Sequence, residues 1–297
     1  MNRGSKFSGH QTFSFRYGWL EKGYRFIESG GSFKDETAFV ELGVGKNMAD
    51  SIRYWCEMTG VTSEEELTPF AKSLFDEKNG WDPYLEDVAS LWLLHWKLIT
   101  NPFYFSSGTA LFSHLHKSEF SKRDVAEAVL RYIDQTSQRA PSDNVIMRDV
   151  DCYVRTYSGK RRFEKKKKYE DSFDCPLREL GLIHPMNDGE LYRFRIGPKH
   201  TLPAEIIGYC IWEYLHCRKK QHSFKIQEAL YHEDSPGQVF MMDENSLIEA
   251  VNLLNGNPRW ASEFSFSESA GIALIHCSLQ DGNELLNSYY REGSVSS

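Results

Sequence analysis

The 297-residue sequence lacks the features that mark membrane-spanning and secreted proteins. It contains no run of about 18 uncharged apolar residues, which a membrane-spanning helix requires. Its first residues, MNRGSKFSGHQTF, hold no apolar segment of the kind that a secretory signal carries. The six cysteines lie far apart without a C-x-x-C pair, so a disulfide framework is excluded. We therefore expect a cytoplasmic protein with reduced and mostly buried thiols.

The sequence lacks an excess of positive charge, because 42 Asp and Glu outnumber 35 Lys and Arg and the formal net charge is −7. This balance argues against a protein that coats nucleic acid without regard to sequence. The basic residues are nevertheless concentrated: residues 1–25 hold five of them against one acid, and residues 148–168 hold nine against three. Acids are concentrated elsewhere, with six of them and no Lys or Arg in residues 228–249. Such segregation permits a basic face on an acidic protein.

Apolar side chains are abundant, at 40% hydrophobic and 14% aromatic residues, and their spacing is mainly helical. We expect a helix from Trp19 to the Gly30-Gly31 stop, a second one from near Ser32, and a third from Lys46 to Thr59. Residues 61–82 are rich in turn signals. Further helices are expected after Pro83 and at about 122–136, 145–157, 203–217, 223–231 and 243–255. Short strands are expected at 175–183, 191–196, 263–266 and 272–277.

The length suggests two domains of about 150 residues each. We place a helical DNA-binding domain at residues 1–157, with a winged helix-turn-helix at about residues 32–82. A basic linker follows at residues 158–174, and a second, winged-helix-like α/β domain at residues 175–297. The predicted fold class is therefore α-rich mixed α/β, with two domains that contain winged-helix-like units.

The helix that begins at Lys46 is the candidate for reading DNA. In a helix-turn-helix the second helix enters the major groove with its N-terminal residues facing the bases. Lysine and arginine neutralise phosphates or bind guanine, and asparagine suits adenine. The candidate DNA-binding residues on this helix are Lys46, Asn47, Ser51 and Arg53. The alternative is an αα-hairpin with a polar outer face.

Two aspartates, Asp149 and Asp151, are the candidate metal ligands and catalytic residues. With Glu164-Lys165-Lys166 they loosely match the acidic pattern of metal-dependent nucleases. Carboxylates in such enzymes hold a divalent metal, here Mg²⁺ or Mn²⁺, which activates water and offsets phosphoryl charge. Glu170, Asp171 and Asp174 are alternative acids.

The basic stretch from Lys160 to Lys168 has two interpretations. It is a solvated linker, or it tracks the DNA backbone through cationic side chains. The DNA-contacting candidates within it are Lys160, Arg161, Arg162, Lys165 and Lys166.

Several strings of the sequence resemble one bacterial family. The strings are FSGHQTFSFRYGWL from Phe7, LGVGKNMADSIRYW from Leu42, GWDPYLED from Gly80, LHW from Leu94 and DCPL from Asp174. They are similar to SspB-type proteins of DNA phosphorothioation gene clusters. The likeness covers most of the chain and is strongest in residues 7–100.

The resemblance implies a nicking endonuclease, which cuts one DNA strand so that sulfur can replace a non-bridging phosphate oxygen. It also implies three protein partners: a cysteine desulfurase, an ATPase and an ATP pyrophosphatase resembling PAPS reductases. A second copy of the chain is a further partner to consider. His10 and Arg16 lie in the family string and suit proton transfer and phosphate contact, respectively. The alternative for His10 is a purely structural role in shaping the loop before the first helix.

Two other functions remain open on sequence grounds. A non-catalytic subunit that delivers the modification enzymes to DNA needs only the helix-turn-helix and a basic face. A protein scaffold would instead use the acidic surfaces.

Overall fold

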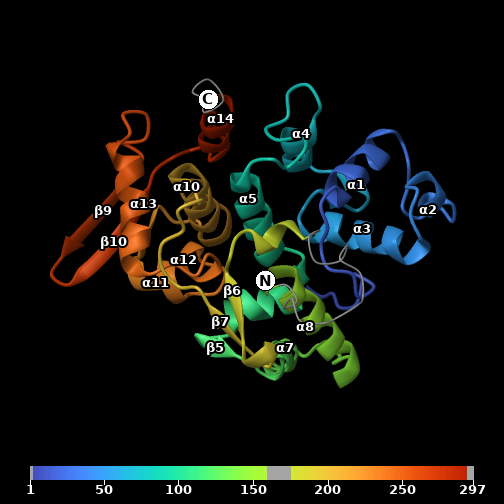
Figure 1. Ribbon diagram of the computed structural model, residues 1–297. Coiled ribbons are helices and arrows are strands. Elements are labelled where there is room, and N and C mark those ends of the chain that lie inside the picture. Colours follow the sequence, from blue (N-terminus) through green and yellow to red (C-terminus); the bar gives the residue numbers. More distant parts are fainter. Residues whose placement is uncertain (1–2, 159–174, 293–297) are drawn as a thin grey trace. The chain divides into compact units, whose positions relative to one another are not determined.

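The computed structural model describes residues 3–158 and 175–292, and it divides into two compact units (Figure 1). The first unit is Met1–Arg195 and the second is Ile196–Ser297. Both units combine helices with small sheets, which confirms the predicted mixed α/β class. No helix among the described residues is long and apolar enough to cross a membrane. The cysteines with described side chains are buried and free, as expected.

The first unit is built mainly from helices. They are α1 (Trp19–Glu28), α2 (Ala38–Glu41), α3 (Lys46–Met58), α4 (Pro69–Phe75), α5 (Val88–Ile99), α6 (Ser107–Thr109), the π-helical turn η1 (Ala110–His114), α7 (Lys122–Gln135) and α8 (Asp143–Ser158). The predicted helices at 19–29, 46–59, 122–136 and 145–157 are therefore confirmed to within a few residues. The helix expected from near Ser32 begins only at Ala38, because residues 33–37 form turns and a bend.

Helix α5 is central to this unit. All but two of its 12 residues are buried, as the apolar residues on most of its sides predict. The Asp87 side chain caps its first turn by accepting a hydrogen bond from the Ala89 N–H. His95 on α5 lies 2.6 Å from the hydroxyl of Tyr157 on α8, a contact that ties the two helices together.

Short strands complete the first unit. They are β1 (Gly4–Ser5), β2 (Thr62–Ser63), β3 (Glu66–Leu67), β4 (Tyr104–Phe105), β5 (Glu119–Phe120), β6 (Ile183–Met186) and β7 (Leu191–Phe194). The parallel pair β1–β4 fixes the start of the chain, and β2–β3 is an antiparallel hairpin. Thus the turn-rich stretch at 61–82 contains a hairpin and helix α4 as well as turns.

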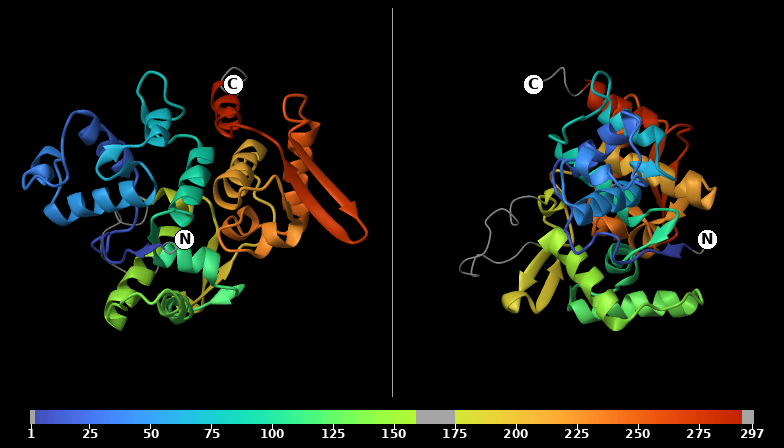
Figure 2. Two further views of the ribbon diagram at one scale, coloured as in Figure 1. Left: turned by 180° about the vertical axis from the view of Figure 1, so that it is seen from behind. Right: turned by 90° about the vertical axis from the view of Figure 1, so that its right-hand side faces the viewer.

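The third sheet of the first unit has the order β5-β7-β6. Its register pairs Glu119 with Arg193 and Ile183 with Phe194, so residues 183–194 are paired with the strand that precedes α7. The 3₁₀ turns η2 (Pro176–Arg178) and η3 (Asn187–Gly189) flank β6, which packs beside α8 (Figure 2). Residues 175–195 therefore belong to the first compact unit, whereas the sequence placed them in a second domain. The linker predicted at 158–174 lies almost entirely outside the described residues.

The second unit has one antiparallel sheet and several helices. Its elements are α10 (Ala204–Trp212), the π-helical segment η4 (Glu213–Lys219), β8 (Ser223–Lys225), α11 (Ile226–Tyr231), α12 (Pro236–Val239), α13 (Glu244–Gly256), β9 (Phe264–Ser269), β10 (Ile272–Cys277) and α14 (Asn283–Glu292). The sheet order is β8-β10-β9. The β9–β10 hairpin turns at Ala270-Gly271, between the two strands that the sequence predicted at 263–266 and 272–277. Helices α10 and α13 pack on each other beneath it.

We predict that Gly23→Ala destabilises the first unit, because α1 and α3 approach closely at this glycine. A Cβ there would lie 2.4 Å from the Cys56 Sγ and 3.2 Å from the Ile52 side chain. Overpacking costs about 1–3 kcal/mol, which outweighs the gain of up to about 1 kcal/mol from replacing a helical glycine. Urea unfolding followed by tryptophan fluorescence measures the net loss.

The control is Gly45→Ala, because a Cβ at Gly45 meets no atom within 4 Å and its φ is −70°. Equal midpoints for Gly23→Ala and the wild type would contradict the close packing of α1 on α3.

Candidate functional site

The loop before α1 is fastened to α8 through one buried carboxylate. The Ser8 N–H and the His10 Nε2 both approach the same Asp149 oxygen, Oδ1, at 2.6 Å and 2.8 Å. The Thr12 N–H donates to His10 Nδ1 at 3.0 Å, so Nδ1 is an acceptor and Nε2 holds the proton. His10 and Asp149 are both fully buried. These contacts support a structural role for His10, since both of its ring nitrogens are already engaged.

The next part of the loop is held by α3 and α8 together. The Phe13 carbonyl accepts hydrogen bonds from Trp55 Nε1 at 3.3 Å and from Cys152 Sγ at 3.2 Å. Arg155 donates to the Thr12 carbonyl at 2.8 Å and to Ser14 Oγ at 3.3 Å. Because both helices are rigid elements of the first unit, the loop from Ser8 to Arg16 has a defined conformation. We refer to residues 8–16 as the anchored loop.

The tip of the anchored loop is strained and exposed. Ser8, Gln11 and Thr12 have positive φ angles of 61°, 48° and 66°, and none of them is glycine. Such residues cost about 1–3 kcal/mol each and persist where surrounding contacts fix them. Gln11 and Thr12 are exposed, whereas Gly9 lies so close to Tyr54 that a Cβ would be 2.3 Å from the ring. A strained and exposed segment on a rigid base is typical of a binding site.

A pocket of about 260 Å³ opens beside the anchored loop. Its lining residues are Thr12, Phe13, Ser14, Phe15, Arg16, Arg155 and Cys175. The Arg16 guanidinium lies 5.4 Å from the ring centroids of both Phe13 and Trp19, which hold it by cation–π contact. The described residues use three of the five N–H donors of Arg155. The pocket therefore combines two guanidinium groups with loop backbone, a combination suited to an anion.

The cysteine in this pocket is not a nucleophile in this arrangement. Burial raises the pKa of the Cys175 thiol to about 12. Its Sγ donates to the Thr156 carbonyl at 2.9 Å. The thiol is therefore protonated near neutral pH, and the thiolate is the reactive form.

The two candidate metal ligands on α8 are not brought together. Residues two apart on a helix diverge by about 200°, and Asp149 accordingly faces the interior while Asp151 is partly exposed. Asp151 pairs with Lys122 Nζ at 2.5 Å and with Arg155 Nε at 2.8 Å. Partial burial alone would raise the pKa of Asp151, but the hydrogen bond from Lys122 and the charge of Arg155 lower it. Asp151 is thus an ionised carboxylate between two cations.

The arrangement at Asp149 does not fit a divalent metal. Its second oxygen, Oδ2, is buried and has no hydrogen-bond partner among the described residues. Mg²⁺ takes several oxygen ligands in near-octahedral geometry. Within residues 3–158 and 175–292, no group of three or more His, Cys, Asp or Glu side chains could hold a metal ion.

The candidate residues on α3 divide into three kinds. Lys46 and Asn47 are exposed in the first turn of the helix, as expected. Ser51 was expected on the same surface but is fully buried, because the loop and α8 cover a second side of α3. Arg53 is partly exposed and lies 3.3 Å from a Glu65 oxygen, so its charge is largely offset within the chain.

The remaining candidates, Lys160, Arg161, Arg162, Lys165 and Lys166, lie outside the described residues, as do the alternative acids Glu170, Asp171 and Asp174. Arg155 was not among the residues predicted to bind DNA, although it belongs to the basic segment at 148–168. The available signal was its spacing of four residues from Asp151, which predicts an ion pair on one helix face.

The chain is similar to one family of proteins and to two solved structures. The model of a family described as "Protein of unknown function (DUF4007)" matches residues 7–290, so the chain belongs to this family. A crystal structure of magnesium-ion-bound SspB is 28% identical, with a TM-score of 0.84 over 98% of this chain and 89% of that chain. A second SspB crystal structure has a TM-score of 0.85 at the same identity and coverage. No curated protein matches the chain. The chain is therefore similar to SspB over nearly its whole length, and the resemblance expected from the sequence is confirmed.

We predict that the loop depends on an acceptor at position 149 rather than on the carboxylate charge. Asp149→Ala leaves the Ser8 N–H and the His10 Nε2–H without an acceptor, which costs about 2–6 kcal/mol at about 1–3 kcal/mol each. Asp149→Asn retains an oxygen acceptor and is expected to lose less than half as much. Urea unfolding of both variants measures the difference. Equal losses would show that the negative charge itself matters.

Proposed function

We propose that this chain binds duplex DNA in a bacterial phosphorothioation system and cuts one strand there. The likeness to SspB over 98% of the chain supports a role in that system. The observation that carries DNA binding is the pocket in which Arg16 and Arg155 meet the exposed backbone of the anchored loop. Guanidinium groups bind phosphate oxygens through paired N–H donors. Because the anchored loop already has a defined conformation, DNA binding does not have to order it, which lowers the entropic cost of binding.

A second contact with DNA is proposed at the start of α3. Lys46 and Asn47 are exposed in the first turn of this 13-residue helix. The N-terminus of a helix carries positive partial charge, which adds to the lysine when a phosphate approaches. In this proposal α2, α3 and the β2–β3 hairpin form a winged helix-turn-helix at about residues 32–82, with Lys46 and Asn47 facing the groove.

The cutting activity rests on the resemblance to SspB-type proteins. The predicted Mg²⁺ or Mn²⁺ site at Asp149 and Asp151 does not match their arrangement, so we assign no catalytic step to these residues. The alternative function, a non-catalytic subunit that brings the modification enzymes to DNA, is favoured by one observation. His10 and Asp149 already bond to each other and to the loop backbone, which occupies the groups expected to do chemistry.

The proposed protein partners also follow from the resemblance. They are a cysteine desulfurase, an ATPase and an ATP pyrophosphatase resembling PAPS reductases. In this scheme the chain provides the DNA contact, and its partners supply the sulfur and the energy for its transfer.

We predict that Arg16→Ala and Lys46→Ala each weaken binding to a duplex about tenfold near 0.1 M salt, because each variant loses one phosphate contact. The slope of log affinity against log salt should fall by about one for each variant. Fluorescence anisotropy with a labelled duplex gives both quantities. Arg131→Ala is the control, since Arg131 is an exposed arginine on α7. Affinities for Arg16→Ala and Lys46→Ala that equal the control would contradict the proposed interface.

A supercoiled plasmid separates the two functions. We expect the purified full chain to convert supercoiled DNA to open circles when Mg²⁺ or Mn²⁺ is added. Asp149→Asn is expected to keep this activity within about threefold of the wild type, because Asp149 acts on the loop and not on the DNA. Plasmid that is bound but stays supercoiled with either metal would contradict cutting and support the recognition subunit.

A further inference from the structure

Tyr17, the residue that follows the anchored loop, presents a hydroxyl group to a carboxylate. Its side chain is 39% exposed, and the hydroxyl donates a hydrogen bond to Glu179 Oε1. Glu179 is itself exposed and comes 162 positions later in the sequence, at the end of the turn η2. A hydroxyl that donates to a neighbouring carboxylate is the arrangement in which a nucleophile has its general base in place.

This pair lies beside the pocket that contains Arg16 and Arg155. Arg16 directly precedes Tyr17, and Cys175, another residue that lines the pocket, flanks the turn η2 at the end opposite to Glu179. Burial raises the pKa of the Tyr17 phenol most, the hydrogen bond and the charge of Glu179 add to this rise, and Cys175 contributes as well. The phenol therefore keeps its proton until a base accepts it, and it lies within electrostatic reach of the pocket wall.

Both partners of the pair are positioned by α8. The turn η2 packs on this helix, and Arg178 Nε donates a hydrogen bond to the Arg155 carbonyl at 3.1 Å. The Arg155 guanidinium in turn binds the Thr12 carbonyl of the anchored loop. One residue of α8 thus holds the turn through its backbone and the loop through its side chain, so that the tyrosine and the carboxylate meet on a rigid base.

We infer, on the basis of the proposed cutting function, that Tyr17 is the nucleophile that cuts the DNA strand and that Glu179 is its general base. Tyrosine is one of the side chains that form covalent intermediates, and it needs a base because its neutral hydroxyl is a weak nucleophile. Arg16 and Arg155 bind the non-bridging oxygens of the same phosphate. Their guanidinium groups offset the charge that develops on these oxygens in the transition state.

The step exchanges one phosphodiester bond for another. The Tyr17 oxygen forms a bond to phosphorus while its proton moves to the Glu179 carboxylate. The bond from phosphorus to one bridging oxygen breaks, and this oxygen leaves as a hydroxyl after it takes a proton from water. Glu179 then returns its proton to the solvent. One strand end is left joined to Tyr17 through its phosphate, and the other end carries a free hydroxyl.

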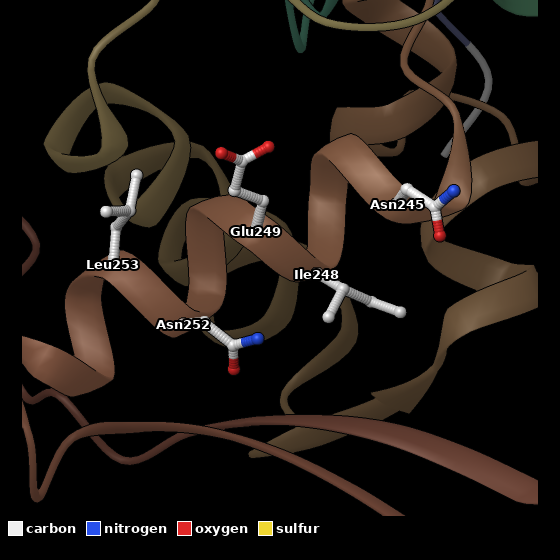
Figure 3. A pocket seen from close by; sticks show the side chains of 5 residues that line it. All are labelled: Asn245, Ile248, Glu249, Asn252 and Leu253. Atoms are coloured by element: carbon white, nitrogen blue, oxygen red, sulfur yellow. The ribbon is translucent and has the colours of Figure 1, made fainter.

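A pocket in the second unit lacks this combination of groups. It has a volume of about 370 Å³ and lies on the outer face of α13, where it is lined by Asn245, Ile248, Glu249, Asn252 and Leu253. Figure 3 shows Glu249 and Leu253 projecting to one side of the helix, and Ile248 and Asn252 to the other. None of the five carries a positive charge, a hydroxyl or a thiol. We therefore place the cutting in the first unit.

The first test compares variants of the full chain on supercoiled plasmid with Mg²⁺ or Mn²⁺. Tyr17→Phe should abolish cutting, because it removes the attacking oxygen and little else. Glu179→Gln keeps an acceptor for the Tyr17 hydroxyl but cannot take its proton, so it should slow cutting about 100-fold or more. Both variants should bind a labelled duplex as tightly as the wild type, since both arginines remain.

Two matched controls should cut at the wild-type rate. They are Tyr231→Phe and Glu268→Gln, which make the same chemical changes at exposed positions of the second unit. Cutting by Tyr17→Phe at the wild-type rate would overturn the inference. Cutting by Glu179→Gln at that rate would overturn the role of Glu179 as base, because the carboxylate would then only hold the tyrosine.

The second test looks for the covalent product, which a structural role of Tyr17 would not produce. Detergent is added to a running reaction of the wild type to trap protein on the plasmid, and potassium then precipitates the protein with any attached DNA. Nuclease and protease digestion, followed by mass spectrometry, should find nucleotides on the peptide that contains Tyr17. Nicked plasmid without attached protein, or an adduct on another residue, would overturn the inference while the proposed cutting stands. Wild-type protein that binds the plasmid without cutting it would contradict the proposed cutting, and the role of Tyr17 would fail with it.

Discussion

One carboxylate oxygen connects two distant parts of the first unit. Asp149 Oδ1 accepts from the Ser8 backbone and from His10, which are 141 and 139 positions away in the sequence. The helix that carries Asp149 packs against α6, α7 and β6, and most of its residues from Asp149 to Tyr157 are buried. A buried donor that loses its acceptor costs free energy. The conformation of the loop therefore depends on the acceptor that α8 provides and not on the loop's own propensities.

This connection explains why strained residues and cationic groups meet in one place. With its base fixed at Ser8 and His10, the chain turns through positive φ angles at Gln11 and Thr12 and returns along Phe13 and Ser14. Arg155, six residues beyond Asp149 on α8, binds the returning segment. The Asp151 carboxylate holds the Arg155 side chain in place and offsets part of the charge of its guanidinium group. The same helix therefore shapes the loop and supplies one wall of the pocket.

Local elements could be predicted from the sequence, and long-range contacts could not. The α3 helix was expected from Lys46 to Thr59 and runs from Lys46 to Met58, because its apolar spacing is a local property. Ser51 was expected on its DNA-facing surface, yet it is fully buried. On this side of α3, Tyr54 contacts α8 and Trp55 contacts the anchored loop. Asp149 was predicted to be a metal ligand for a similar reason. Its hydrogen-bond partners, Ser8 and His10, are far away in the sequence, and the local pattern around Asp149 does not reveal them. Arg16 was expected to contact phosphate from the family string, and the structure places it in the pocket with Arg155.

Amide hydrogen exchange of the full chain, with and without a duplex, tests the central claim that the anchored loop forms the DNA interface. The account predicts that DNA slows exchange in residues 11–17 and 46–50 and leaves the outer face of α13 unchanged. Protection confined to residues 244–256 and the β9–β10 hairpin, with none in the loop, would contradict it.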